Sequence, residues 1–159
     1  MKTRLILFLS CTLFLAGCSA TARLYPIRGP LSSQTPTPVY LAKFSGAFRS
    51  GTLTATLDGG EICTGRWQMV PRPKLEKGAT NATDPAAGNM TAEWDLVYGH
   101  GFYVAQVLGQ RLYVRSTLTG NRGTVLTAEM YRPDTQHAAL GSIKGVAKDD
   151  KNNIYKIAF

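Results

Sequence analysis

Cysteine and histidine are scarce in this sequence, and the few that occur are scattered. The 159 residues include three cysteines, Cys11, Cys18 and Cys63, and two histidines, His100 and His137. Protein zinc sites bring Cys and His together in short spacings, and neither histidine has such a neighbour. The sequence therefore predicts no metal site.

The motifs of several large enzyme classes are missing as well. There is no glycine-rich phosphate loop, no dinucleotide fingerprint and no Gly-x-Ser-x-Gly nucleophile elbow. Glycosidases use paired carboxylates, and Glu61, Glu93, Asp95 and Glu129 leave such a pair open, although nothing in the sequence singles out two of them. There is no run of consecutive basic residues, so we expect no nucleic-acid partner. The sequence predicts no cofactor and no catalytic residue, and it leaves open whether the protein is an enzyme.

Long apolar runs are also missing, which decides how the N-terminus is interpreted. Lys2 and Arg4 precede two short apolar segments, 5–9 and 13–15, and small residues follow them. A transmembrane helix needs about 20 apolar residues, whereas a charged start, a short apolar segment and small residues are typical of a secretory signal. We expect residues 1–17 to be a signal peptide.

The end of this segment, Leu15-Ala16-Gly17-Cys18, resembles the lipobox of bacterial lipoproteins. In that class the cysteine thiol receives a diacylglyceryl group, signal peptidase II cuts before the cysteine, and the new amine is usually acylated, for example with palmitate. The resemblance implies that Cys18 is the first residue of the mature protein and anchors it to a membrane. Ser19, in place of aspartate, favours the outer membrane over the inner one, with the domain facing the periplasm.

The mature chain would be basic and would hold one unmodified thiol. The formal net charge of +8 includes Lys2 and Arg4, so the chain without its signal carries +6. Such a charge attracts anionic envelope lipid or polymer, although ordinary surface charge gives the same number. Cys63 is the thiol left over, so no intramolecular disulfide can form. Its alternation with Trp67 and Met69 predicts a buried thiol rather than a nucleophile.

Composition divides the mature chain into a tether and a domain. Residues 18–38 contain several prolines and show no helix or strand periodicity, which predicts a lipidated cysteine followed by a Pro-rich spacer. Residues 39–159 are expected to form the domain. Within it, residues 71–90 carry few large apolar side chains and predict a mobile loop.

The domain shows the alternation of short antiparallel strands. Leu53, Ala55 and Leu57 share one face, and Asp58-Gly59-Gly60 supplies a tight turn into a second strand over 61–70. Similar patterns predict strands over 92–98, 112–118, 124–131, 139–148 and 153–159, the last two around a solvated turn at 149–152. Residues 102–108 fit a strand or a short buried helix. The fold class is therefore all-β: a single antiparallel β-sandwich or small β-barrel of about eight strands.

Two further similarities bear on organisation. Residues 51–55 and 123–128 both open predicted hairpins whose second strands carry Gly65 and Gly145, which raises the hypothesis of two related half-units. The stretches 60–67 and 145–155 are similar to small, uncharacterised bacterial lipoproteins, and this resemblance covers much of residues 39–159. It implies no activity and carries over no functional residue.

One surface feature supports a binding hypothesis. Arg111, Tyr113 and Arg115 are predicted on one face of a strand, with Arg122 in the next turn and Arg132 after the following strand. Arginine makes bidentate contacts with phosphate or carboxylate, so these five residues could form an anion-binding face, although an ordinary exposed sheet face has the same pattern. The sequence thus favours a periplasmic lipoprotein that binds or scaffolds an envelope lipid, polymer or protein. The alternative is an enzyme acting on envelope polymers or thiols.

Overall fold

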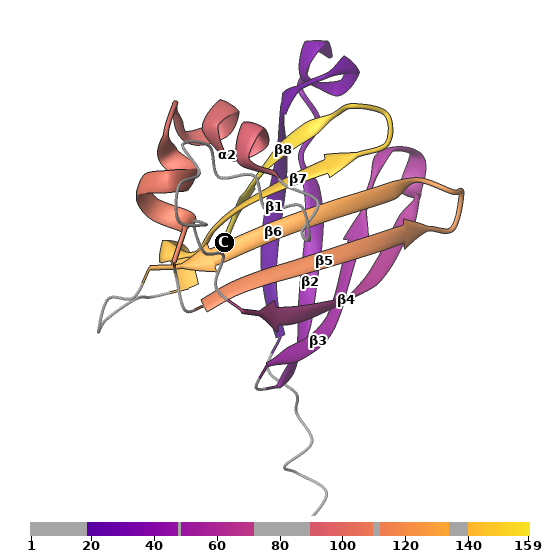
Figure 1. Cartoon of the computed structure of the whole chain (residues 1–159). Coiled ribbons are helices and arrows are strands. Elements are labelled where there is room, and N and C mark those ends of the chain that lie inside the picture. Colours follow the sequence, from indigo (N-terminus) through magenta and orange to yellow (C-terminus); the bar gives the residue numbers. More distant parts are fainter. Residues whose placement is uncertain (1–18, 48, 72–89, 110–111, 134–139) are drawn as a thin grey trace, which may run out of the picture.

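The chain folds into a closed eight-stranded antiparallel β-barrel with a small helical layer on one side (Figure 1). The computed structural model describes residues 19–47, 49–71, 90–109, 112–133 and 140–159. The strands are β1 (Ser19–Arg28), β2 (Tyr40–Ala47), β3 (Ser50–Thr56), β4 (Ile62–Val70), β5 (Leu112–Gly120), β6 (Val125–Arg132), β7 (Lys144–Asp149) and β8 (Ile154–Ala158). Each strand pairs with the next in the chain, and β8 pairs with β1. The all-β prediction is confirmed, and of its two architectures the barrel is the correct one.

The interior of the barrel is filled by buried side chains, among them those whose alternation predicted inward-facing positions. Leu53, Ala55 and Leu57 of the first hairpin are buried, and Gly59 and Gly60 have the positive φ values, 62° and 79°, that the turn requires. Barrels of eight strands leave an interior that side chains can fill. Here alanines and larger residues share this space: Ala22, Leu24, Tyr40, Ala42, Cys63, Leu118, Leu126, Ala128, Met130, Ala147, Tyr155 and Ile157.

The predicted tether is the first correction. Residues 19–28 form β1, which pairs with both β2 and β8 and closes the barrel. Ala22 and Leu24 alternate into the core, each 1% exposed, and a register shift between Pro26 and Arg28 accommodates the proline. Residues 29–39, which include η2 (Pro30–Ser33), remain outside the strands. The barrel therefore begins at Ser19, not at residue 39.

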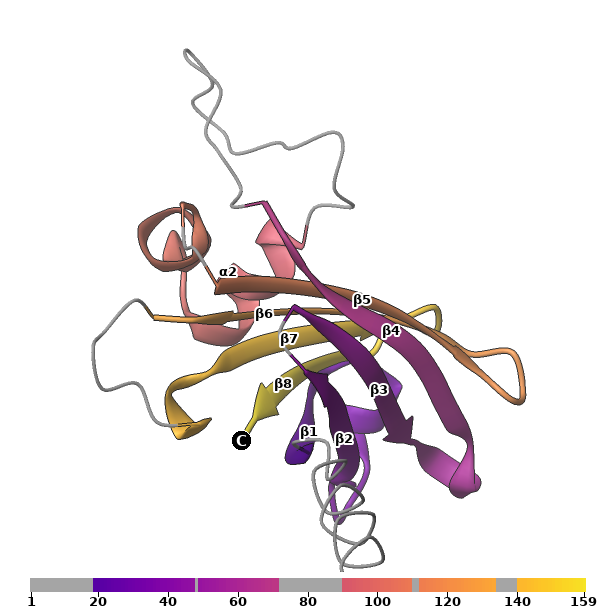
Figure 2. The same cartoon turned by 90° about the horizontal axis from the view of Figure 1, so that it is seen from below.

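The second correction concerns residues 91–98, which form the helix α2 (Thr91–Tyr98) instead of a strand. All eight strands of the barrel already have two neighbours, so no edge is open to another strand. Residues 103–107, left undecided between strand and helix, form the π-helix η4 (Tyr103–Val107). These two helices cover the outer face of β5, β6 and β7, as the view in Figure 2 also shows.

Other expectations have mixed outcomes. The last hairpin starts at Lys144, after the 3₁₀ turn η5 (Leu140–Ser142), and not at residue 139. The similar segments lie in β3–β4 and β6–β7, three strands apart, whereas the two halves of the barrel are four strands apart. The signal peptide, Cys18 and nearly all of the predicted mobile loop lie outside the described residues. No helix in the described part of the chain is long and apolar enough to cross a membrane.

Candidate functional site

One end of the barrel, which we call the mouth, gathers four connections. They are η2, the β3–β4 turn (residues 57–61), which contains the 3₁₀ turn η3 (Asp58–Gly60), the β5–β6 turn (121–124) and the β7–β8 turn (149–153). In Figure 1 they lie at the top and right of the barrel. Side chains from all four line a cavity of about 490 Å³. Ligand pockets commonly measure about 300–1,000 Å³, so this cavity has the size for a small ligand.

Asp149 organises the β7–β8 turn. Its Oδ1 accepts hydrogen bonds from the backbone N–H groups of Lys151 (2.9 Å) and Asn153 (2.8 Å). Its Oδ2 accepts from Asn153 Nδ2 (2.8 Å) and from the Tyr155 hydroxyl (2.7 Å). Asp149 is only 4% exposed and Asn153 2%. The prediction of a solvated turn holds for Asp150, Lys151 and Asn152, which are exposed, but not for Asp149, whose carboxylate points inward, where four protein donors replace water.

Glu61 connects the β3–β4 turn to the β5–β6 turn through hydrogen bonds of its carboxylate. Its Oε1 accepts from the N–H groups of Arg122 (3.2 Å) and Thr124 (3.1 Å), and its Oε2 from the Thr124 hydroxyl (2.8 Å). A side chain at Gly120 would collide with this carboxylate, which explains a glycine at the end of β5. The Thr124 hydroxyl, helped by the two N–H groups and Lys151, lowers the pKa of Glu61 despite its burial. Glu61 therefore stays ionised.

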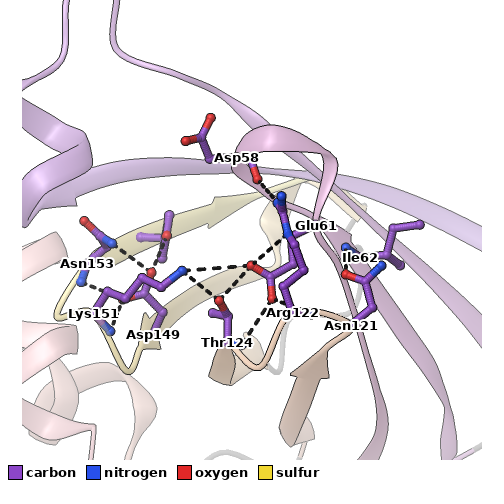
Figure 3. A network of polar contacts seen from close by, with 10 residues as sticks. Asp58, Glu61, Ile62, Asn121, Arg122, Thr124, Asp149, Lys151 and Asn153 are labelled. Carbon is purple, nitrogen blue, oxygen red and sulfur yellow. Dashed lines mark hydrogen bonds and ion pairs between the residues drawn. The ribbon is translucent and has the colours of Figure 1, made fainter.

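Two exposed cations, Arg122 and Lys151, lie close to the Glu61 carboxylate (Figure 3). The Nε of Arg122 and the Nζ of Lys151 each lie 3.9 Å from Glu61 Oε2. Arg122 also donates from Nη2 to the Asp58 carbonyl (2.6 Å), and Lys151 donates to the Thr124 hydroxyl (2.9 Å). Their side chains are 53% and 63% exposed, so both retain N–H groups that can reach a ligand in the cavity.

Two tyrosines lie below the polar groups. Tyr155 lines the cavity, and burial, followed by its hydrogen bond to Asp149, raises the pKa of its hydroxyl. Tyr40 packs edge-on against Tyr155, with the ring centroids 6.3 Å apart. The Tyr40 hydroxyl is buried without a hydrogen-bond partner among the described residues, and burial, followed by the charges of Asp58 and Asp149, raises its pKa. A buried hydroxyl without a hydrogen-bond partner lowers the stability of a fold by about 1–3 kcal/mol. The Tyr40 hydroxyl is thus a polar group at the mouth that the fold does not use.

The chemistry of the mouth suits binding better than proton transfer. A general base needs a lone pair that can reach a substrate proton. Both oxygens of Asp149 and both of Glu61 already accept hydrogen bonds from the protein. What remains accessible is a pair of cations, with the Asp58 side chain beside them.

The predicted basic-aromatic face is not assembled as one exposed surface. Tyr113 is 1% exposed beneath the helical layer, and Arg115 donates from Nε (3.1 Å) and Nη2 (2.9 Å) to Glu129 Oε1. Arg122 lies at the mouth, whereas Arg132 is exposed at the far end of β6, roughly 30 Å away along the chain at about 3.3 Å per residue. Arg111 lies outside the described residues. The alternation correctly put Tyr113 and Arg115 on the outer face, but it could not indicate that α2 and η4 cover that face.

The covered wall contains a buried ion pair that the sequence did not suggest. Glu129 is fully buried, and its Oε2 accepts from Trp94 Nε1 (3.0 Å) while Arg115 holds Oε1. The Trp94 ring also packs edge-on against Tyr131 of β6, with the ring centroids 5.6 Å apart, and these two contacts fix α2 to β6. A second cavity of about 340 Å³ lies beside α2. Glu93 and Lys148 both line it and form an ion pair of 2.9 Å with each other. These contacts attach the helical layer and leave no carboxylate pair for catalysis among these residues.

The remaining candidates behave as isolated residues. Cys63 is completely buried in the barrel, as predicted, and burial followed by the charge of Glu61 raises the pKa of its thiol. A buried thiol with a raised pKa is a poor nucleophile. His100 is exposed, 3.9 Å from Asp95, and His137 lies outside the described residues. In the ranges that the structure describes, no three His, Cys, Asp or Glu side chains could hold a metal ion together.

No protein-family model matches the chain, and no curated protein and no solved structure shows significant similarity to it. The assignment of a site therefore depends on geometry. Two stretches that are far apart in the sequence, 60–67 and 145–155, meet at the mouth: Glu61 comes from the first, and Asp149, Lys151, Asn153 and Tyr155 come from the second. The sequence indicated neither their proximity nor their burial.

Proposed function

We propose that this protein is a lipid-anchored lipoprotein of the bacterial cell envelope that acts by binding, with the mouth of the barrel as its binding site. The lipobox-like residues 15–18 support the anchor, and the outer membrane, facing the periplasm, is the favoured location. One observation carries the binding site: a cavity of about 490 Å³ is surrounded by a hydrogen-bonded polar network and two exposed cations. Pockets with a few convergent polar groups are the usual form of small-ligand sites.

The ligand we propose is a small polar molecule, or a polar group of an envelope component, that accepts hydrogen bonds. Arg122 and Lys151 offer donors over the cavity, while Glu61 and Asp149 hold the surrounding turns in place through internal hydrogen bonds. Groups that are fixed before binding lose little entropy when the ligand arrives. The hydrogen bonds already made by both carboxylates and the burial of Cys63 are the reason to prefer binding over the enzyme alternative.

The anchor is tested by replacing its thiol. In cells fed a palmitate analogue, the protein should become labelled and sediment with membranes, and Cys18→Ser should lose both properties. Cys63→Ser is the matched control, because it removes the other mature cysteine and should leave labelling unchanged. A Cys18→Ser protein that still labels would contradict the lipoprotein assignment.

The binding site is tested by comparing what co-purifies with the lipidated protein. Molecules bound or crosslinked to the wild type should be lost from Arg122→Ala/Lys151→Ala. They should be retained by Arg28→Ala/Arg66→Ala, which removes two exposed cations outside this cavity. The same set of bound molecules in both double variants would rule out the mouth as the site.

A further inference from the structure

The end of the barrel opposite the mouth, which we call the base, has a different surface. It comprises the start of β1, the β2–β3 turn, the end of β4, the start of β5, the end of β6, the start of β7 and the C-terminal residues after β8. Half-buried apolar side chains line the barrel here: Phe44, Trp67, Val114, Ile143 and Phe159. The rings of Phe44 and Phe159 are 5.1 Å apart, and Trp67 Nε1 donates to the Ser45 carbonyl (3.1 Å).

The charges at the two ends have opposite balance. The described turns and strand ends of the base carry three cationic side chains, Arg49, Arg132 and Lys144, and no aspartate or glutamate. Arg49 and Arg132 are exposed, and Lys144 lies over the rings of Tyr98 (5.3 Å) and Phe102 (6.0 Å). The mouth carries four acids, Asp58, Glu61, Asp149 and Asp150, against Arg28, Arg122 and Lys151. The basic charge of the described barrel is therefore displaced toward the base.

The position of Ser19 connects this asymmetry to the membrane. Ser19 is the first residue of β1 and pairs with Ser45 of β2 at the base. It directly follows Cys18, so if Cys18 carries the lipid, no spacer separates the anchor from the barrel wall. Tryptophan and phenylalanine are favoured where an apolar surface meets headgroups, and each lysine or arginine near an anionic membrane surface adds attraction.

We infer that the barrel rests on the membrane by its base, with Arg49, Arg132 and Lys144 on anionic lipid headgroups, and directs its mouth away from the membrane. The inference rests on the proposed lipid anchor, which sets the orientation of the barrel. The charge of the base supports its contact with the membrane. A strand of ten residues rises about 33 Å, and barrel strands tilt by about 35–45°, so the mouth would open about 25 Å above the headgroups. A ligand would then reach the cavity from the periplasm.

The contact is tested without the lipid, so that failure of the anchor and failure of the surface remain distinguishable. Unlipidated mature protein, Cys18→Ser, is mixed with phosphatidylcholine vesicles containing phosphatidylglycerol, and binding is measured by co-sedimentation. It should bind at low salt and dissociate near 1 M salt, where the Debye length is about 3 Å. Arg49→Gln/Arg132→Gln should weaken binding about thirtyfold, from the usual attraction per basic residue.

The matched control is Arg28→Gln/Lys151→Gln, which lowers the net charge equally but changes two exposed residues at the mouth. We expect it to weaken binding by no more than about threefold, because those charges lie away from the surface. Equal weakening in both double variants would overturn the inference, since net charge alone would then explain attraction. Absence of wild-type binding at low salt would overturn it as well, even if Cys18 is acylated in cells.

Discussion

The mouth and the base close the same barrel in different ways. At the mouth, buried carboxylates of Glu61 and Asp149 join four connections through hydrogen bonds. At the base, half-buried aromatic and aliphatic side chains such as Phe44 and Phe159 pack against one another. Because apolar packing is enough to close one end, the barrel does not require a buried polar network at the other. Buried polar groups are costly unless fully paired, so the difference supports a functional reason for the mouth.

The largest effect should come from the carboxylate that holds the mouth. Asp149→Ala leaves four donors, three of them buried, without their acceptor, and we expect the free energy of unfolding to fall by about 3 kcal/mol or more. Asp150→Ala, which changes the exposed neighbour, should stay within about 0.5 kcal/mol of the wild type. Urea denaturation measures both values. Similar values for the two variants would mean that the network does not stabilise the mouth.

At the base, single truncations should cost less. Phe44→Ala and Phe159→Ala should each lower the free energy of unfolding by about 1–2 kcal/mol, less than fully buried phenylalanines, because both are half-buried. The double variant should reveal a coupling of about 0.5–1.5 kcal/mol between the two rings. Additive effects would show that the rings do not stabilise the base as a pair.

The two ends should also differ in their response to acid. The lowered pKa of Glu61 means that its stabilising contribution is complete above the ordinary glutamate value of 4.5 and is lost as the pH falls through the lower value of the folded state. Glu61→Gln should therefore flatten the decline of stability below pH 4.5. Phe159→Ala removes no charge and should lower the whole curve without changing its shape. Parallel acid limbs for Glu61→Gln and the wild type would contradict this assignment.

The smallest effect concerns Cys63, which lies inside the barrel between the two ends. Because it is fully buried and its pKa is raised, a polar thiol reagent at pH 8 should modify the native Cys18→Ser protein hardly at all, and one thiol should react after denaturation. Mass spectrometry of the native and unfolded samples gives the count. Rapid labelling of native protein would mean that one end opens far enough to admit the reagent.

The sequence predicted the position of a residue well where its neighbours in the sequence determine that position, and poorly where distant segments do. Leu53, Ala55 and Leu57 were placed correctly because alternation alone defines the inward face of a hairpin. β1 was mistaken for a tether because Pro26, with three more prolines after it, obscured a strand that gains its stability from pairing with β2 and with β8, which is distant in sequence. The estimate of about eight strands held in part because β1 replaced the segment that proved to be α2.

The candidate site was less predictable than the fold. Asp149 and Glu61 are 88 positions apart and carry charges that usually indicate solvent exposure, so nothing local revealed their burial at one end of the barrel. The prediction of an exposed face at Tyr113 and Arg115 was wrong for the opposite reason. A helical layer covers this outer face, which in other sheets normally meets water. A glycine such as Gly120, next to a glutamate in space, is explained only by the packing.

The central claim, that the base faces the membrane and the mouth faces away, can be measured directly on the lipidated protein. Cys18 would be acylated and Cys63 is buried, so a cysteine introduced at exposed Gln68 near the base or at exposed Asp150 in the mouth can carry a spin label. Power-saturation measurements in anionic vesicles report how closely each label approaches the bilayer. We predict a label at position 68 near the headgroups and a label at position 150 in water. Equal depths, or the deeper label at position 150, would contradict the account.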